Sequence, residues 1–157
     1  MSHTLGATVA FTIRPVIDRD FFAWHELFEG YCDFYETPLN DEKAVRAWSW
    51  FTSEPLLAEA MVAVDDETGQ LLGLAHFREF VDALAGGTGL YLDDLYVRPD
   101  ARGQGVGSAL IERLREIGVE RHAFVVRWIT AKNNETARRL YDRVAEKTKW
   151  VTYDLKA

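Results

Sequence analysis

The sequence predicts a single domain of the α/β class, and three observations support this. The chain has 157 residues, which at ~100 to 200 residues per domain is enough for one compact core and too few for two. Hydrophobic residues make up 48% of the chain and aromatic residues 13%, which is too much for a disordered protein. Segments with the apolar spacing of strands alternate with segments that have the spacing of helices.

The first part of the chain predicts one strand followed by two helices. Residues 10–16 alternate between apolar and polar side chains, as in a strand. Asp18 offers an N-cap for a helix over residues 21–31, whose apolar positions recur at helical spacing. Asn40, with acidic residues in the first turn, opens a second helix whose apolar side chains at positions 45–51 share one face.

The middle of the chain predicts a hairpin and then a parallel pair of strands. Residues 58–64 and 71–80 have strand patterns on either side of a turn. Residues 90–97 form an apolar strand interrupted by two consecutive carboxylates, and residues 124–130 form a nearly continuous apolar strand. Because a helix over residues 106–117 joins these two strands, we expect them to be parallel, with a right-handed crossover.

The last part of the chain predicts one more helix and a closing strand. Asn134 is expected to cap a helix whose inward positions are Ala137, Leu140, Tyr141 and Val144. Residues 150–155 alternate as a final strand.

Charge and composition limit the possible partners and the cell compartment. The 25 acidic and 18 basic residues give a net charge of -7, which repels nucleic acid and favours a small cationic partner. A single cysteine, Cys32, cannot form an internal disulfide. The polar start of the chain lacks the pattern of a secretion signal, and no apolar run approaches the ~20 residues of a membrane span. We therefore expect a cytoplasmic protein without a membrane partner.

A glycine-rich loop, Arg102-Gly103-Gln104-Gly105-Val106-Gly107, lies between the strand at residues 90–97 and the following helix. Glycines let main-chain N–H groups approach an anion, and a helix N-terminus adds partial positive charge. The Walker sequence is absent, and Ser108 stands where the dinucleotide fingerprint requires glycine. The loop therefore predicts a phosphate or pyrophosphate site of another kind, with a tight turn that binds nothing as the alternative.

Two motifs in this sequence resemble those of the GNAT superfamily of N-acetyltransferases. Arg102-x-x-Gly105-x-Gly107, preceded by Leu95-Tyr96-Val97-x-Pro99, is similar to the acetyl-CoA pyrophosphate loop of that family. Asn134-x-x-Ala137-x-x-Leu140-Tyr141 resembles its second cofactor motif. The resemblance spans essentially the whole chain and is closest to the diamine and polyamine acetyltransferases.

The resemblance implies a fold, a coenzyme and an assembly. The fold would be a mixed, mostly antiparallel sheet with one splayed parallel strand pair and about four flanking helices. The protein would be a homodimer that uses acetyl-CoA, with residues 150–155 as a possible contact between copies. The expected acetyl-CoA contacts are Leu95, Tyr96, Val97, Arg102, Gly103, Gln104, Gly105, Val106, Gly107, Ser108 and Asn134.

The resemblance also implies how the cofactor strand and Asn134 act. A bulge near Leu95 would leave main-chain N–H groups free to stabilise charge on the acetyl oxygen. Asn134 would bind the pantetheine arm, although capping the last helix explains this residue equally well.

Catalytic roles follow from the same resemblance. Tyr141 would be the general acid, because a tyrosine with a pKa of ~10 can protonate a thiolate whose conjugate acid has a pKa of ~8.5; the alternative is a core tyrosine. Asp93 lies where the polyamine branch has a glutamate. Transfer of a proton from an ammonium with a pKa of ~10 to a carboxylate with a pKa of ~4 costs about 8 kcal/mol. Asp93 is therefore interpreted as an anchor and proton relay rather than as a strong base. Asp94 is the competing candidate for this role. Alternatively, both Asp93 and Asp94 are solvated charges at the end of a strand.

The acceptor pocket is predicted from the connection between the first two helices. Its residues would be Tyr31, Tyr35 and Glu36 together with Asp94, because aromatic faces beside carboxylates suit a cationic amine. Packing of the aromatic rings within the helix pair is the alternative reading.

The predicted activity is acetyl transfer from acetyl-CoA to a primary amine by direct attack in a ternary complex. A small polyamine or diamine-like metabolite is the favoured acceptor. A protein or peptide amine, either lysine or N-terminal, is one alternative, and a noncatalytic acyl-CoA-binding regulatory module is another. His25, His76 and His122 have no metal-ligand spacing, so no metal is expected.

Overall fold

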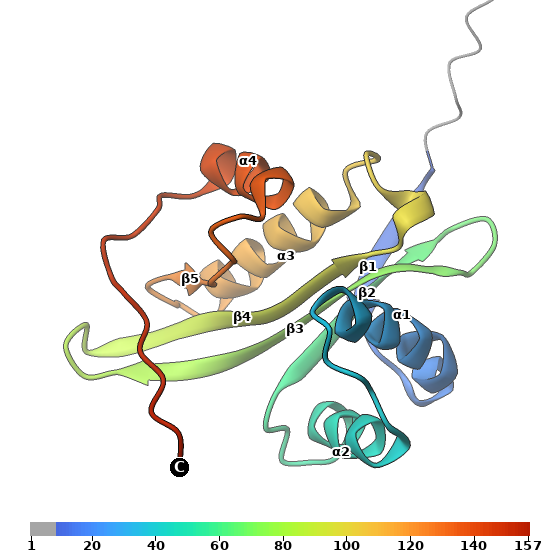
Figure 1. Cartoon of the computed structure of the whole chain (residues 1–157), viewed down its shortest axis with the longest axis horizontal. Coiled ribbons are helices and arrows are strands. Elements are labelled where there is room, and N and C mark those ends of the chain that lie inside the picture. The colour runs from blue at the N-terminus through green and yellow to red at the C-terminus, as the bar shows by residue number, and fades with distance from the viewer. Residues whose placement is uncertain (1–8) are drawn as a thin grey trace, which may run out of the picture.

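A central sheet of five strands carries helices on both faces (Figure 1). The computed structural model describes residues 9–157. Its strands are β1 (Phe11–Pro15), β2 (Glu59–Asp65), β3 (Leu71–Asp82), β4 (Gly87–Val97) and β5 (Val126–Arg127). Its helices are α1 (Phe21–Phe34), α2 (Asp41–Thr52), α3 (Val106–Glu120) and α4 (Glu135–Val144), with short 3₁₀ turns η1 (Asp18–Asp20) and η2 (Pro99–Ala101).

The strands lie in the order β1-β2-β3-β4-β5, and only β4 and β5 are parallel. This confirms the predicted class, the mixed sheet and the parallel pair joined by α3. None of the helices in residues 9–157 is long and apolar enough to cross a membrane.

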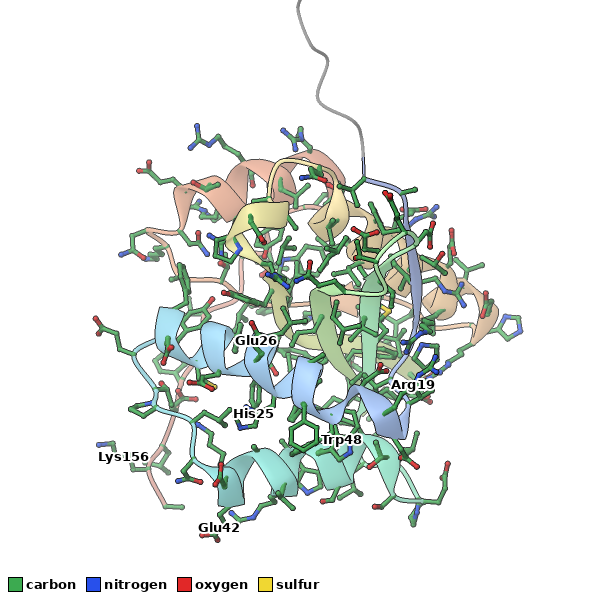
Figure 2. The ribbon with its side chains drawn as sticks, turned by 90° about the vertical axis from the view of Figure 1, so that its right-hand side faces the viewer. Arg19, His25, Glu26, Glu42, Trp48 and Lys156 are labelled. Atoms are coloured by element: carbon green, nitrogen blue, oxygen red, sulfur yellow. The ribbon has the colours of Figure 1, made fainter. Side chains whose placement is uncertain are left out.

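Because successive side chains of a strand point to opposite faces of the sheet, each face carries its own hydrophobic core. On one face, Ala75 and Leu90 pack with Leu110 and Leu114 of α3. On the other face, α1 and α2 cover β2 and β3; in Figure 2, Trp48 lies between these two helices. Burying one such leucine stabilises the fold by about 1.5–3 kcal/mol, so both helix layers are held mainly by apolar packing.

The β4–β5 pair is much shorter than the sequence predicts. The register pairs Leu90 with Val126 and Tyr91 with Arg127, and the Phe124 N–H also donates to the Thr88 carbonyl at 2.9 Å. Beyond Tyr91 and Arg127 the two strands separate. The predicted strand over residues 124–130 is therefore reduced to two residues, whereas the predicted splaying is confirmed. An apolar run is compatible with a strand, but only pairing makes it one.

The predicted closing strand over residues 150–155 is wrong for this chain. That segment is extended but pairs with no strand among residues 9–157. Its apolar side chains are largely exposed, from 73% for Trp150 to 96% for Leu155. The physical reason is that β5, with only two residues, offers a very short edge for further hydrogen bonding.

The helix caps were partly predicted. Asn40 caps α2, where its side chain accepts a hydrogen bond from the N–H of Lys43 at 2.8 Å. The N-cap of α1 is Asp20 rather than Asp18, because Asp18 begins a 3₁₀ turn. Asn134 stands at the start of α4 but makes no side-chain capping bond, and Val144 is 51% exposed rather than inward.

Candidate active site

The loop between η2 and α3 has the backbone geometry of an anion site. Gly103 and Gly105 have φ angles of 77° and 83°, a left-handed conformation that other residues adopt only with strain. Gly105 is also the N-cap residue of α3, and open space surrounds the position where a Cβ would stand. The glycines are therefore required by the path of the chain.

This path leaves a run of main-chain donors without partners. Among the described residues, none of the N–H groups of residues 103–108 donates a hydrogen bond to the protein. The first such bond runs from Ala109 to the carbonyl of Gly105, at 3.0 Å. Consecutive free N–H groups at a helix N-terminus bind phosphate, so this loop fits the diphosphate of a coenzyme.

Arg102 ties the loop to the end of β4. Its Nε donates to the carbonyl of Val97 at 3.0 Å, and its guanidinium lies over the ring of Tyr96, 5.6 Å from the centroid. The predicted cofactor residues on β4 and on the loop are thus neighbours in the structure.

A β-bulge places the two carboxylates of β4 on the same face of the sheet. His76 of β3 pairs with Asp94, whereas Phe77 pairs with Leu92, so Asp93 is the extra residue. Asp94 contacts His76 and Asp93 contacts Arg78, and these two partners are two residues apart on β3. Since residues two apart point the same way, the bulge brings both carboxylates to the side covered by α1 and α2.

Asp94 is held by His76 in a largely buried position. Its Oδ2 lies 2.9 Å from Nδ1 of His76. Burial favours the protonated carboxyl, but the interactions with His76, and to a smaller extent with Tyr31, outweigh burial and lower the pKa of Asp94. The pKa of Tyr31 is raised, first by burial and then by the charge of Asp94. Asp94 is therefore a fixed anion beside a protonated tyrosine.

Asp93 behaves differently from Asp94. Both of its oxygens accept from Nε of Arg78, at 3.1 and 3.2 Å, and Arg78 lies 4.7 Å over the ring of Tyr91. Burial nevertheless raises the pKa of Asp93 above its ordinary value, and the negative charge of Asp94 acts in the same direction. Of the two carboxylates, Asp93 is the one that holds a proton more readily.

Tyr141 lies on α4, half-buried against the ring of Trp128, with centroids 5.3 Å apart. Burial raises the pKa of its hydroxyl, with a further contribution from Tyr35. The ring of Tyr35 in turn packs against that of Tyr31, with centroids 5.0 Å apart, and the charge of Asp94 raises the pKa of Tyr31. Tyr31 and Tyr35 therefore form a series with Asp94 and Tyr141, in which the two tyrosine rings pack on each other and the links to Asp94 and Tyr141 are electrostatic.

One predicted pocket residue does not join this series. Glu36 is exposed, has a φ angle of 53°, and makes no side-chain hydrogen bond or ion pair within residues 9–157. Asn134, by contrast, lies at the start of the helix that carries Tyr141. Because it makes no capping bond, the capping explanation of Asn134 loses its support.

The sequence reasoning missed His76, Trp24 and Arg78. The signal for His76 was present, because alternation along β3 places it on the same buried face as Leu74. A buried histidine needs polar partners, and the two consecutive carboxylates of the neighbouring strand were available. Within residues 9–157, no group of three or more His, Cys, Asp or Glu side chains is arranged to hold a metal ion.

Comparison with known proteins assigns the fold and the loop to a family. Residues 24–145 match the sequence model of the acetyltransferase (GNAT) family. The chain belongs to this family. It is therefore an N-acetyltransferase, and members of the GNAT family use acetyl-CoA, which the free amides of residues 103–108 fit.

Individual relatives agree with this assignment. The chain is 32% identical over 141 residues to the D-amino-acid N-acetyltransferase HPA3 of Saccharomyces cerevisiae, covering 90% of this chain and 88% of the relative. It is 31% identical over 104 residues to a thialysine N-epsilon-acetyltransferase of Sus scrofa, covering 64% of this chain and 61% of the relative. A ribosomal-protein-alanine N-acetyltransferase from Brucella melitensis biovar Abortus 2308 superimposes with a TM-score of 0.80 at 26% identity, covering 94% of this chain and all of that one.

Proposed function

We propose that this enzyme acetylates a primary amine of a small cationic metabolite, of the polyamine or diamine type. The observation that carries the proposal is the bulge that turns Asp93 and Asp94 to one face, beside Tyr31. Two carboxylates beside aromatic rings attract and orient an alkylammonium group. The net charge of -7 adds a long-range attraction for the same class of molecule.

The loop and the splayed strand would hold the coenzyme. The amides of residues 103–108 would bind its diphosphate, with Arg102 fixing the loop to β4. On its β5 side, β4 has no strand partner beyond Tyr91, so the main chain of Leu95, Tyr96 and Val97 on that side would face the pantetheine arm. Asn134, free of a capping role, would hydrogen-bond to that arm. When bound, acetyl-CoA supplies an activated acetyl thioester.

The side chains would divide the proton transfers between them. Asp94 remains ionised and adds negative charge that attracts the ammonium group of the acceptor. Asp93, whose pKa is raised by burial, acts as anchor and relay for the proton that the amine must lose. The hydroxyl of Tyr141 holds the proton that the leaving sulfur requires, and its raised pKa keeps it protonated at neutral pH.

The relatives support a small amine acceptor without specifying one. Their names describe D-amino acids and thialysine, both of which present a free primary amine. A peptide amine is the second candidate, favoured by the superposition on a ribosomal-protein-alanine acetyltransferase.

A screen of acetyl-CoA consumption separates these acceptors. It should include polyamines, free amino acids, aminoglycosides and a lysine peptide, with Tyr141→Phe and Asp93→Asn as variants. We expect turnover with polyamines or diamines that falls in both variants while CoA binding persists. Activity confined to the peptide would contradict the small-molecule acceptor. CoA binding without turnover on any amine would indicate a regulatory module instead.

We also propose that the protein forms a homodimer. The exposed apolar side chains of residues 150–155 would be covered by a second copy. Sedimentation should show a dimer at micromolar concentration, and removal of residues 150–157 should yield a monomer. A full-length monomer would refute this contact. The cytoplasmic location stays a prediction from the sequence.

A further inference from the structure

His76 is a buried polar ring in an aromatic environment. It lies on β3 with 2% of its surface exposed. The ring of Phe51 stacks on it with centroids 4.3 Å apart, and that of Phe28 meets it edge-on at 5.3 Å. An imidazole in such a place is stable only if its nitrogens are hydrogen-bonded.

Both nitrogens of His76 have partners, and together these fix where the proton sits. Nε2 lies 2.9 Å from the indole nitrogen of Trp24, and Nδ1 lies 2.9 Å from Oδ2 of Asp94. An indole N–H can only donate, so Nε2 must accept with its lone pair. The ring proton is then on Nδ1 and is donated to Asp94. A second proton on Nε2 would face the indole N–H, donor against donor.

We propose that His76 is a positioning residue of the acceptor site: Trp24 fixes its tautomer, and its Nδ1–H holds Asp94 as a carboxylate facing the amine. The inference rests on the proposed function, because it takes the acceptor amine to bind beside Asp94. A quarter of the Asp94 side chain remains exposed, so the carboxylate is accessible on one side while His76 holds it from the other.

The other groups around Asp94 do not replace this donor. Tyr31 of α1 and Lys43 of α2 favour the ionised form of Asp94 less than His76 does, and Asp93 on the same strand repels its charge. Without the Nδ1–H of His76, burial and the charge of Asp93 would both favour the protonated carboxyl. The acceptor amine would then meet a weaker and less oriented anion.

Three variants test the role of His76. His76→Phe keeps a ring in the aromatic pocket but removes the donor, and His76→Asn places an amide N–H close to the position of Nδ1. His25→Gln is the matched control, since His25 also lies near a carboxylate, Glu29 at 3.6 Å, but outside the site. For each variant we would measure kcat and KM for the best amine of the screen. Carboxyl ¹³C NMR would follow the titration of Asp94, and ¹⁵N NMR of the coenzyme-free protein would report the histidine tautomers.

The expected results distinguish positioning from structural support. In wild-type protein, ¹⁵N NMR should show His76 protonated on Nδ1 alone. His76→Phe should raise KM for the amine roughly tenfold or more and raise the titration midpoint of Asp94 by about one pH unit, since a hydrogen bond to a charged group is lost. Its kcat should change less than its KM. His76→Asn should recover most of both effects, and His25→Gln should match the wild type.

Several results would overturn the inference. Protonation of Nε2 in the wild type would contradict the fixed tautomer, and an unchanged KM and Asp94 midpoint in His76→Phe would contradict the positioning role. If His76→Phe does not fold, His76→Gln takes its place, because its amide reaches the position of Nε2 and leaves that of Nδ1 without a donor. An unchanged KM and Asp94 midpoint in His76→Gln would contradict the positioning role equally. A wild-type enzyme that acetylates no amine contradicts the proposed function, whereas the NMR measurements concern His76 by themselves.

Discussion

The anion-binding role of the loop can be tested by replacing Gly105 with alanine. Gly105 has a φ angle of 83°, and no atom lies within 4 Å of the position where a Cβ would stand. The substitution therefore introduces backbone strain without a steric clash. A left-handed conformation costs a non-glycine residue about 1–2 kcal/mol. In a protein of this size, that corresponds to a fall in Tm of about 2–4 °C per kcal/mol.

Gly69 provides a matched control for this strain. It also has a positive φ angle, 74°, and open space at its Cβ position, but it lies in the turn between β2 and β3. Gly69→Ala and Gly105→Ala should thus lower the free energy of unfolding by similar amounts. Only Gly105→Ala should disturb the free amides of residues 103–108, because relief of its strain rotates the neighbouring peptide groups.

Calorimetric titration with CoA separates the two variants. We expect the Kd of Gly105→Ala to rise about tenfold or more, which corresponds to about 1.4 kcal/mol of binding free energy. Gly69→Ala should bind CoA as the wild type does. Thermal scans with and without CoA should agree, with a smaller ligand-induced rise in Tm for Gly105→Ala. Equal CoA affinity in both variants and the wild type would refute the assignment of the diphosphate to this loop.

Three further predictions concern stability and are checked by thermal or urea unfolding. Gly30→Ala should destabilise the fold by about 1–3 kcal/mol although alanine favours helices, because the new Cβ would lie 2.5 Å from the hydroxyl oxygen of Tyr96. Adding Tyr96→Phe should recover part of the lost stability, and a Gly30→Ala variant more stable than the wild type would refute the contact. Asn40→Ala should cost about 1 kcal/mol through loss of the α2 cap, and an unchanged Tm would contradict that cap. The pKa of Asp20 is lowered, because the hydrogen bonds from Arg14 and from the Ile17 N–H outweigh the effect of burial. Its ionised form therefore stabilises the fold at pH values above the ordinary pKa of ~3.9. This stabilisation is lost as the pH falls through the lower pKa of the folded state. Asp20→Asn should therefore lower Tm at pH 7 and match the wild type more closely near pH 3, and a constant difference would count against the ion pair.

Local patterns in the sequence were sufficient for most of the fold. Alternation predicted the β2–β3 hairpin, and helical spacing with the Asn40 cap predicted α2. These features depend on residues close together in the chain, where spacing determines which side chains share a face. The glycine loop was also predictable from local sequence, because positive φ angles favour glycine over other residues.

Features that depend on distant partners were not predictable in the same way. The strand pattern of residues 150–155 is intact, but no edge of suitable length receives it. The His76–Asp94 contact joins two strands at a bulge, and a one-residue change in register would have turned Asp94 to the other face. Sequence spacing alone does not set that register. The sequence therefore indicated Asp93 and Asp94 as a candidate pair but not their structural partners His76 and Arg78.

The length of chain between the β4 bulge and the glycine loop also fixes how far apart the two proposed binding sites lie. One continuous stretch of chain carries Asp93 and Asp94, then Arg102, and then the free amides of the loop. Because β4 is fixed in the sheet on its β3 side, this stretch would be a spacer of constant length between the proposed sites of the acceptor amine and the coenzyme. An insertion or deletion between Asp94 and Gly103 would move one proposed site relative to the other, whereas changes of length in the β3–β4 turn would leave that separation intact.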